Sequence, residues 1–334
     1  MSLDLAFIWA MLLAFAVLAY VILDGFDLGV GIVFPWLEET EHRDTAMNSI
    51  APVWDGNETW LVLGGGGLFA VFPLAYATLL PAFYAPIIAM LLGLVLRGVA
   101  FEFRFRTERG KFVWDWAFAA GSLIAALAQG IMLGAFVQGV RVSGRAYAGG
   151  WFDWLTPFSI VTGIAVAVGY SLFGATWLIW RTTGKLQDRA YALARPLALG
   201  LIAAILLISL WTPFLNPQFL RRWFAFPAII VVAPVPTLTF AAAYQLWFAV
   251  RDRREFAPFA ATLALFVLSY VGLGISLYPH IVPPAITIWD AAAPDASLAF
   301  LLTGTVVLVP LILAYTGYAY WVFRGKTDPA GGYH

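Results

Sequence analysis

The sequence contains no cysteine and only three histidines among its 334 residues. The lack of cysteine excludes disulfides, thiolate-ligated haem, iron–sulfur clusters and Cys-based zinc sites. His42 lies in an acidic stretch, His280 in a proline-rich turn and His334 at the last position. Because paired histidines on facing helices cannot be formed from these three, we expect this chain to ligate no haem and to hold no metal.

Charged residues are also scarce. They make up 11% of the chain, against about 25% in a typical soluble domain, whereas 62% of residues are apolar and the mean hydropathy is +0.85. The 15 Trp, 27 Phe and 13 Tyr suit many helix ends at two membrane interfaces. The formal net charge is zero, so we expect no nucleic-acid partner. The composition therefore predicts an integral membrane protein.

Apolar stretches of about 20 residues, the length of a membrane-spanning helix, recur along the whole chain. They predict an all-α integral membrane protein with about nine transmembrane helices, forming a single membrane domain over residues 1–334 with short connections. The expected helices lie near residues 6–34, 53–73, 77–101, 115–139, 157–180, 193–213, 226–250, 257–278 and 297–323.

The distribution of Lys and Arg predicts the orientation, because short basic loops stay in the cytoplasm. Loops on one side of the expected helices carry 14 of the 19 basic residues, loops on the other side carry four, and Arg97 lies within a helix. This alternation predicts a periplasmic N-terminus and a cytoplasmic C-terminus.

Two acidic residues lie inside the first expected helix, where an ionisable side chain costs about 2.5–3.5 kcal/mol on insertion scales. Asp24 and Asp27 are three residues apart, so both carboxylates lie on one helical face. Gly25 and Gly29 form a small-xxx-small surface that allows another helix to approach closely. The acids are candidate functional residues. The alternative is that two acids near a helix end simply reach cytoplasmic water.

A second polar group opens the second expected helix. Pro52 suits a first helical turn, and Asp55 and Glu58 complement the positive helix N-terminus. Capping does not require Trp54 and Asn57 as well, and two carboxylates beside an amide could hold water for proton transfer. Capping and proton transfer both stay open on these residues alone.

Arg97, in the third expected helix, is permanently charged and needs an anion, because an unpaired buried guanidinium is costly. Asp24, Asp27 or a carboxylate of another chain could supply it. The alternative is that Arg97 extends to the cytoplasmic headgroups.

Other polar and small residues receive structural interpretations. Gln129 and Gln138 are expected to form interhelical hydrogen bonds, and Trp114-Asp-Trp116 to mark an interface. The run Gly64–Gly67 is a poor helix interior by propensity, so we expect it to contact another helix closely.

Several ordered segments resemble subunit II of the cytochrome bd quinol oxidases, and the resemblance extends over the whole chain. The segments are Asp24-Gly-Phe-Asp-Leu-Gly-Val-Gly31, Asn48-Ser-Ile-Ala-Pro-Val-Trp-Asp-Gly-Asn57, Trp60-Leu-Val-Leu-Gly-Gly-Gly-Gly-Leu-Phe-Ala70, Leu96-Arg-Gly-Val-Ala-Phe-Glu-Phe-Arg104, Trp114-Asp-Trp116, Leu277-Tyr-Pro-His280, Thr287-Ile-Trp-Asp290 and Val309-Pro-Leu-Ile-Leu-Ala-Tyr-Thr316.

The resemblance implies a complex in the bacterial inner membrane. In this complex subunit I carries b-type and d-type haems, oxidises quinol from the membrane pool near the outer face and reduces dioxygen to water. Subunit II would be two four-helix bundles plus one peripheral helix and would ligate no haem. The resemblance leaves open small single-helix subunits, the choice of quinol, and a quinone or lipid bound to this chain.

The family also has a proton path from the cytoplasm, entered near the Asp of the Trp-Asp-Gly-Asn motif. In this chain that residue is Asp55, with Asp24, Asp27, Trp54 and Glu58 expected to line or shape the path. Arg97 would balance their charge. An amide replaces Glu58 in some relatives, and the short loops are similar to those of the cyanide-insensitive branch, which leaves the subtype open.

Two alternatives remain at this point. Intramembrane acids, an arginine and glycine-rich helices also describe a proton-coupled secondary transporter, which would function alone. A purely structural subunit that only stabilises subunit I is the second.

Overall fold

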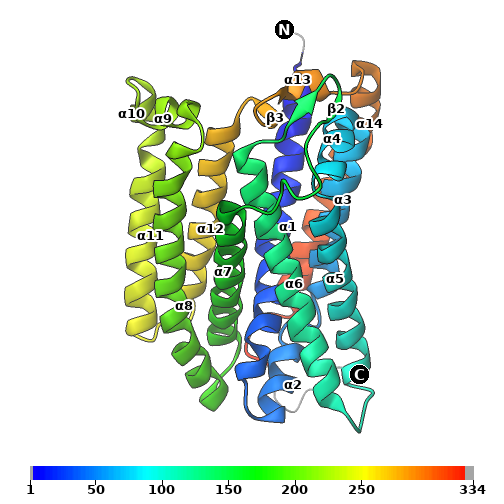
Figure 1. The fold of residues 1–334 in the computed structure, drawn as a ribbon. Coiled ribbons are helices and arrows are strands. Elements are labelled where there is room, and N and C mark those ends of the chain that lie inside the picture. Colours follow the sequence, from blue (N-terminus) through cyan, green and yellow to red (C-terminus); the bar gives the residue numbers. More distant parts are fainter. Residues whose placement is uncertain (1–2, 328–334) are drawn as a thin grey trace.

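The computed structural model describes residues 3–327, and nearly all of its regular structure is helical (Figure 1). The α-helices of this part of the chain are α1 Leu5–Val33, α2 Thr40–Asn48, α3 Trp54–Val71, α4 Pro73–Ala82, α5 Tyr84–Arg104, α6 Lys111–Gln138, α7 Pro157–Arg181, α8 Gly184–Trp211, α9 Pro217–Phe224, α10 Ala228–Val232, α11 Pro234–Arg251, α12 Ala257–Leu277, α13 Ile288–Ala291 and α14 Asp295–Val322. Two short 3-10 helices, Phe34–Trp36 and Thr212–Phe214, continue α1 and α8. Strands β1 Val142–Ser143 and β2 Ala146–Tyr147 form one hairpin, and β3 His280–Val282 and β4 Ile286–Thr287 form another.

Eight helices of the described residues are long and apolar enough to cross a membrane, and the number is nine if α3 and α4 count as one bent span. The bend is 120° and lies at Phe72, because Pro73 follows it and has no N–H to continue the α3 ladder. The expected third helix over 77–101 was wrong at its start. Residues 77–82 belong to α4, and α5 begins only at Tyr84.

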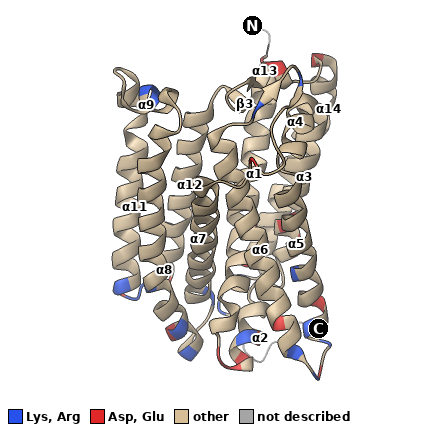
Figure 2. Ribbon diagram, viewed as in Figure 1, with Lys and Arg blue, Asp and Glu red and all other residues tan. Residues whose placement is uncertain are grey.

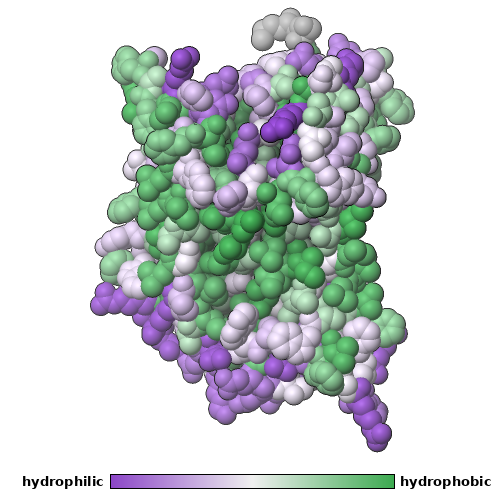
Figure 3. Space-filling view, viewed as in Figure 1, coloured by the Kyte–Doolittle hydropathy of each residue, from purple (hydrophilic) through white to green (hydrophobic). Residues whose placement is uncertain are grey.

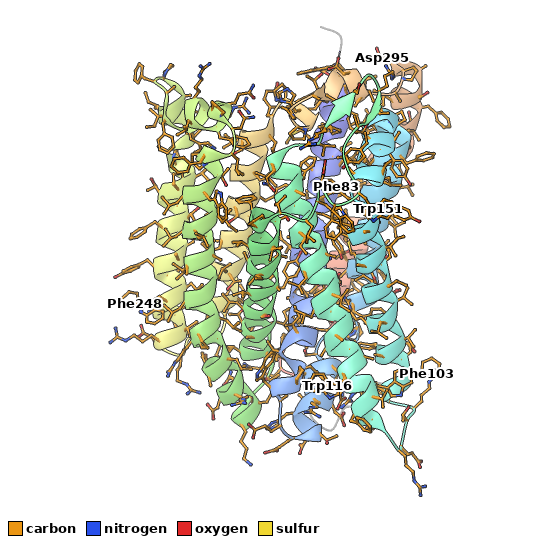
Figure 4. All side chains as sticks on the ribbon, in the orientation of Figure 1. Phe83, Phe103, Trp116, Trp151, Phe248 and Asp295 are labelled. Atoms are coloured by element: carbon orange, nitrogen blue, oxygen red, sulfur yellow. The ribbon has the colours of Figure 1, made fainter. Side chains whose placement is uncertain are left out.

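The two ends of the molecule differ in charge (Figure 2). Lys and Arg gather at the lower end in this view, where α2, the start of α6 and the ends of α5, α7 and α11 lie. We call this the basic end. Between the two ends the surface is mainly apolar (Figure 3). Among the labelled side chains, Phe103 and Trp116 lie near the basic end, Asp295 lies at the opposite end, and Phe248 points outward from α11 (Figure 4).

Helix α1 is the central element of the fold. It contacts α3, α6, α7, α12 and α14. Its closest approach is to α7, where a Cβ atom built on Gly29 would lie 1.8 Å from the Tyr170 carbonyl oxygen and 2.6 Å from the Gly174 nitrogen. Only glycine fits this contact. The expectation that Gly25 and Gly29 admit another helix is thus met by α7.

Apolar side chains stay exposed on the outer surfaces of α3, α5 and α14, as they do on other spans such as α8 and α11. We call the outer surfaces of α3, α5 and α14 the α3/α5/α14 face, and these three helices lie on the right of Figure 1. Its exposed members include Val62, Phe69, Leu92, Val95, Val307 and Leu311. Gly65 and Gly66 have no atom of the described chain within 4 Å of an added Cβ, whereas Gly64 and Gly67 contact side chains of α1. The expected close contact of the glycine run is therefore wrong for Gly65 and Gly66.

Candidate functional site

A buried ion pair joins α1 to α5. Arg97 Nη1 donates to Asp24 Oδ1 at 2.6 Å, and the side chains are 1% and 0% exposed. The pair answers the question left by the sequence: the anion for Arg97 is Asp24, and extension of Arg97 to the headgroups was wrong. Two charges placed out of water stabilise a fold only when they pair, so this contact fixes α1 against α5 at the depth of Asp24.

Asp27 belongs to a second set of contacts. Asn57 Nδ2, on the first turns of α3, donates to Asp27 Oδ2 at 2.7 Å and lies 3.2 Å from the Leu23 carbonyl oxygen. The Tyr320 hydroxyl of α14 donates to Asn57 Oδ1 at 3.0 Å. The Asn57 amide therefore connects α1, α3 and α14. Asp27 is fully buried and accepts its hydrogen bond from Asn57, whereas Arg97 donates to Asp24.

On the α6 and α7 side, Asp24 faces a chain of neutral polar groups. Tyr170 Oη donates to Gln129 Oε1 at 2.9 Å, and Gln129 Nε2 donates to Tyr20 Oη at 2.8 Å. Tyr20 lies one helical turn before Asp24 on α1. An amide releases no proton near neutral pH, so Gln129 ends this branch.

Three atoms of these side chains are buried without a hydrogen-bond partner in the described part of the chain: Asp24 Oδ2, Asp27 Oδ1 and Arg97 Nη2. Buried polar atoms usually have a partner, and ordered water supplies it where protein does not. We call Asp24, Asp27, Asn57, Glu58 and Arg97 the buried polar cluster. Its free atoms suit it to hold water.

The three predicted residues Trp54, Asp55 and Glu58 lie in the first turns of α3. Glu58 is half-buried and near enough to Arg97 and Asp24 for Coulombic interaction. Asp55 is exposed in the first turn of α3. The Trp54 ring stacks on Phe101 with centroids 4.9 Å apart, and Arg97 Cζ is 5.9 Å from the centroid of Trp54. The structure thus places four of the other five predicted residues around Arg97, and Asp55 outside them on the surface.

A separate ion network lies at the basic end. Arg104 donates to Asp44 Oδ1 and Asp115 Oδ1, both at 2.5 Å, and Arg43 Nη1 donates to Asp115 Oδ2 at 2.9 Å. Arg104 is fully buried. We call these four residues the Arg104 network. Trp114-Asp-Trp116 was interpreted as structural, and Asp115 does join α6 to α2 and α5.

The sequence did not identify Tyr20, Tyr170 and Tyr320 as members of the site, and for Gln129 and Gln138 it predicted the kind of contact but not the partner. Tyr20 lies four residues before Asp24, a spacing that could have flagged it. Tyr170 and Tyr320 carry no local signal, since an isolated Tyr in an apolar helix is common. Gln129 forms the expected interhelical bonds, whereas Gln138 accepts from Thr156 in the loop before α7. His280 lies in β3, and His334 lies outside the described residues.

Comparison with known proteins identifies the family. A sequence model of the cytochrome bd terminal oxidase subunit II family matches residues 5–323. The chain belongs to this family. It is 33% identical to "Cytochrome bd-I ubiquinol oxidase subunit 2" of Escherichia coli (strain K12), over 96% of this chain and 95% of that protein. It is 30% identical to "Cytochrome bd ubiquinol oxidase subunit 2" of Bacillus subtilis (strain 168), over 96% of each.

The fold agrees with this assignment. The solved structure of a bd oxidase from Geobacillus thermodenitrificans matches 96% of this chain and 99% of that chain with a TM-score of 0.75, at 20% sequence identity. Cytochrome bd subunit II proteins lie in the bacterial inner membrane as multi-pass proteins, and the apolar helices of this chain agree with that location.

Family membership confirms the resemblance and settles the class of activity. This subunit II is part of a quinol oxidase complex that includes a subunit I and haems. No group of three or more His, Cys, Asp or Glu side chains among residues 3–327 could hold a metal ion. The transporter alternative is not favoured by the family assignment.

Proposed function

We propose that this chain is the subunit of a cytochrome bd-type quinol:oxygen oxidoreductase that ligates no haem and conducts protons from the cytoplasm toward the oxygen site of subunit I. The buried polar cluster is the observation that carries the proposal. It brings two fully buried carboxylates, one arginine and unpartnered polar atoms together, a costly arrangement that packing alone does not require.

The proposed path begins at Asp55, which is exposed at the start of α3 near the basic end. It continues through Glu58, which is half-buried one turn further along the helix, with the Trp54 ring shaping its side. Asp24 and Asp27 are its innermost members. Arg97 neutralises Asp24, so the cluster can gain or lose one proton without holding two uncompensated negative charges.

The path leaves the chain toward α3 and α5 in this proposal. On the other side the Gln129 amide ends the polar branch, and beyond it Tyr170 is stacked on Phe266 with centroids 5.6 Å apart. The α3/α5/α14 face lies next to the cluster and exposes apolar side chains together with Gly65 and Gly66. The two glycines leave room for a helix of subunit I to approach α3 closely.

The same proposal includes the finer points of the complex. The N-terminus is periplasmic and the C-terminus cytoplasmic, which places the basic end inside. The helices form two four-helix bundles with α14 as the peripheral helix, in agreement with the small buried share of α14. Subunit I holds the b-type and d-type haems.

A proton path without redox cofactors has a physical purpose. Oxygen reduction consumes protons, whereas quinol oxidation near the outer face releases them. If the consumed protons come from the cytoplasm, charge crosses the membrane without a pump. A purely structural subunit would not need the exposed Asp55 beside a buried acid cluster.

Affinity purification of this chain from its native membrane tests the proposed assembly. We expect a haem-bearing partner, a reduced-minus-oxidised spectrum with haem bands and quinol-dependent oxygen uptake. A haem-free chain that runs alone and shows no oxygen uptake would refute it.

A further inference from the structure

Three arginine side chains in the described part of the chain are more than nine-tenths buried, and two of them have a carboxylate partner. Arg97 pairs with Asp24, and Arg104 pairs with Asp44 and Asp115. Arg181, at the end of α7, is 8% exposed and has no carboxylate partner within residues 3–327. Its Nη2 donates to the Phe323 carbonyl oxygen, and its Nε has no partner.

Arg181 lines a pocket of about 70 Å³ at the basic end, which we call the Arg181 pocket. A second arginine, Arg324, lines it as well, together with Trp177, Trp180 and Tyr320. No Asp or Glu is among the lining residues. One water needs roughly 10–15 Å³ of such space, so the pocket can take a group larger than a single water.

The groups that already contact Arg181 reduce the free-energy cost of burying its charge, but none of them carries a negative charge to neutralise it. Its Cζ lies 5.2 Å from the Trp177 ring centroid and 5.9 Å from that of Trp180, and a single carbonyl accepts from it. A buried cation with no counter-ion is costly, and the guanidinium fork suits two oxygens of one anion. The pocket needs an anion.

Position in the membrane indicates which anion. The pocket is lined by two tryptophans and lies at the basic end, the level at which aromatic residues meet lipid headgroups, and side chains at the end of α14 beside it, including Trp321 and Val322, are exposed. Basic pockets between helices on this side of membrane proteins bind phosphate-bearing headgroups. We propose that the Arg181 pocket binds the phosphate group of an anionic phospholipid. Inorganic phosphate shares this chemistry, so the experiment separates the two sources.

The test uses the whole oxidase complex, purified and delipidated in detergent, and counts bound lipid by native mass spectrometry. The probes are phosphatidylglycerol, zwitterionic phosphatidylcholine and inorganic phosphate. The variants are Arg181→Gln, the exposed pocket residue Arg324→Gln, and Arg254→Gln as a matched control at an exposed position of the basic end that does not line the Arg181 pocket. Arg324→Gln keeps the test valid if Arg181→Gln assembles poorly.

We expect at least one phosphatidylglycerol to bind wild type and Arg254→Gln roughly tenfold more tightly than Arg181→Gln, since a hydrogen bond to a charged group is lost. Arg324→Gln should show a smaller loss, and phosphatidylcholine should not compete. If inorganic phosphate bound to wild type and not to Arg181→Gln, while phosphatidylglycerol did not bind, the pocket would be a site for free phosphate and the lipid proposal would be refuted.

Two results would overturn the proposal. One is equal phosphatidylglycerol binding by wild type, Arg181→Gln and Arg324→Gln. The other concerns Asp328, the next acidic residue along the chain after the described part. If Asp328→Asn lowered the thermal stability of the complex as much as Arg181→Gln and neither variant changed lipid binding, Asp328 and not a lipid would be the counter-ion.

Discussion

Replacement of Arg97 by glutamine would leave the Asp24 carboxylate buried at 0% exposure without the guanidinium 2.6 Å from its Oδ1. Removal of one partner of a buried ion pair typically costs about 3–5 kcal/mol, because the remaining charge stays out of water. Asp24→Asn should cost less, because Asp27 and Glu58 also interact with Arg97. The double variant Asp24→Asn/Arg97→Gln removes both charges and should recover most of the loss.

The measurement is the free energy of unfolding of the purified complex in detergent, by denaturant titration, for wild type, both single variants and the double variant. We expect a coupling energy of about 2–3 kcal/mol between the two sites. Arg254→Gln, at an exposed position, should stay within about 0.5 kcal/mol of wild type. The reasoning would be refuted if Arg97→Gln were as stable as wild type, or if the double variant lost the sum of both single losses.

Three further predictions concern stability. Gly29→Ala should prevent assembly or lower stability by several kcal/mol, because its Cβ would lie 1.8 Å from the Tyr170 carbonyl oxygen. The control Gly56→Ala should be neutral, because an added Cβ there has nothing within 4 Å. Thermal unfolding of both variants checks this prediction. Asp115→Asn should lower stability by about 1.5–3 kcal/mol in the same assay, because Arg104 Nε and Arg43 Nη1 lose a charged acceptor. A loss of stability no larger than that of the control Glu108→Gln, at an exposed position, would contradict this prediction. The Thr287 hydroxyl and backbone N–H hold the pKa of Asp290 below its ordinary value of 3.8, so its stabilisation of the β4 and α13 corner is present above that pH and is lost as the pH falls through the lowered pKa. The protection of amides at this corner, expressed relative to the intrinsic exchange rate at each pH, should fall between about pH 5 and pH 3 in wild type but stay level in Asp290→Asn, and equal profiles would refute the assignment.

The family could be predicted because the sequence contains ordered segments that resemble it, and the class of fold because lipid imposes strong rules. Apolar runs of sufficient length locate the helices, and the glycine pair at Gly25 and Gly29 marks a close helix contact. The expected end of the second helix at residue 73 lies next to the bend at Phe72, but the separate helix α4 and the break between α4 and α5 at Phe83 were missed. A proline near the end of a span is compatible with a new straight helix that begins at the proline or with a bend within one span. Only tertiary packing decides between the two.

The candidate site was predictable in composition but less so in pairing. A buried Arg97 needs an anion, yet sequence spacing cannot choose Asp24 over Asp27, because the choice depends on how α1 is rotated against α5. Asn57 holds Asp27 and thereby leaves Asp24 for the arginine. Tyr320 is 263 residues from Asn57 in sequence, and no local pattern connects them.

The most direct test of the account is the Asp55→Asn complex, compared with the matched control Asp252→Asn at an exposed position of the basic end. Haem content, assembly and the rate of proton uptake during oxygen reduction are measured in each. We predict that Asp55→Asn retains the partner and its haem spectrum but takes up protons and turns over at least tenfold more slowly, a loss of about 1.4 kcal/mol in the rate-limiting step, while Asp252→Asn matches wild type. Unchanged proton uptake and turnover in Asp55→Asn would contradict the claim that protons enter this chain at Asp55.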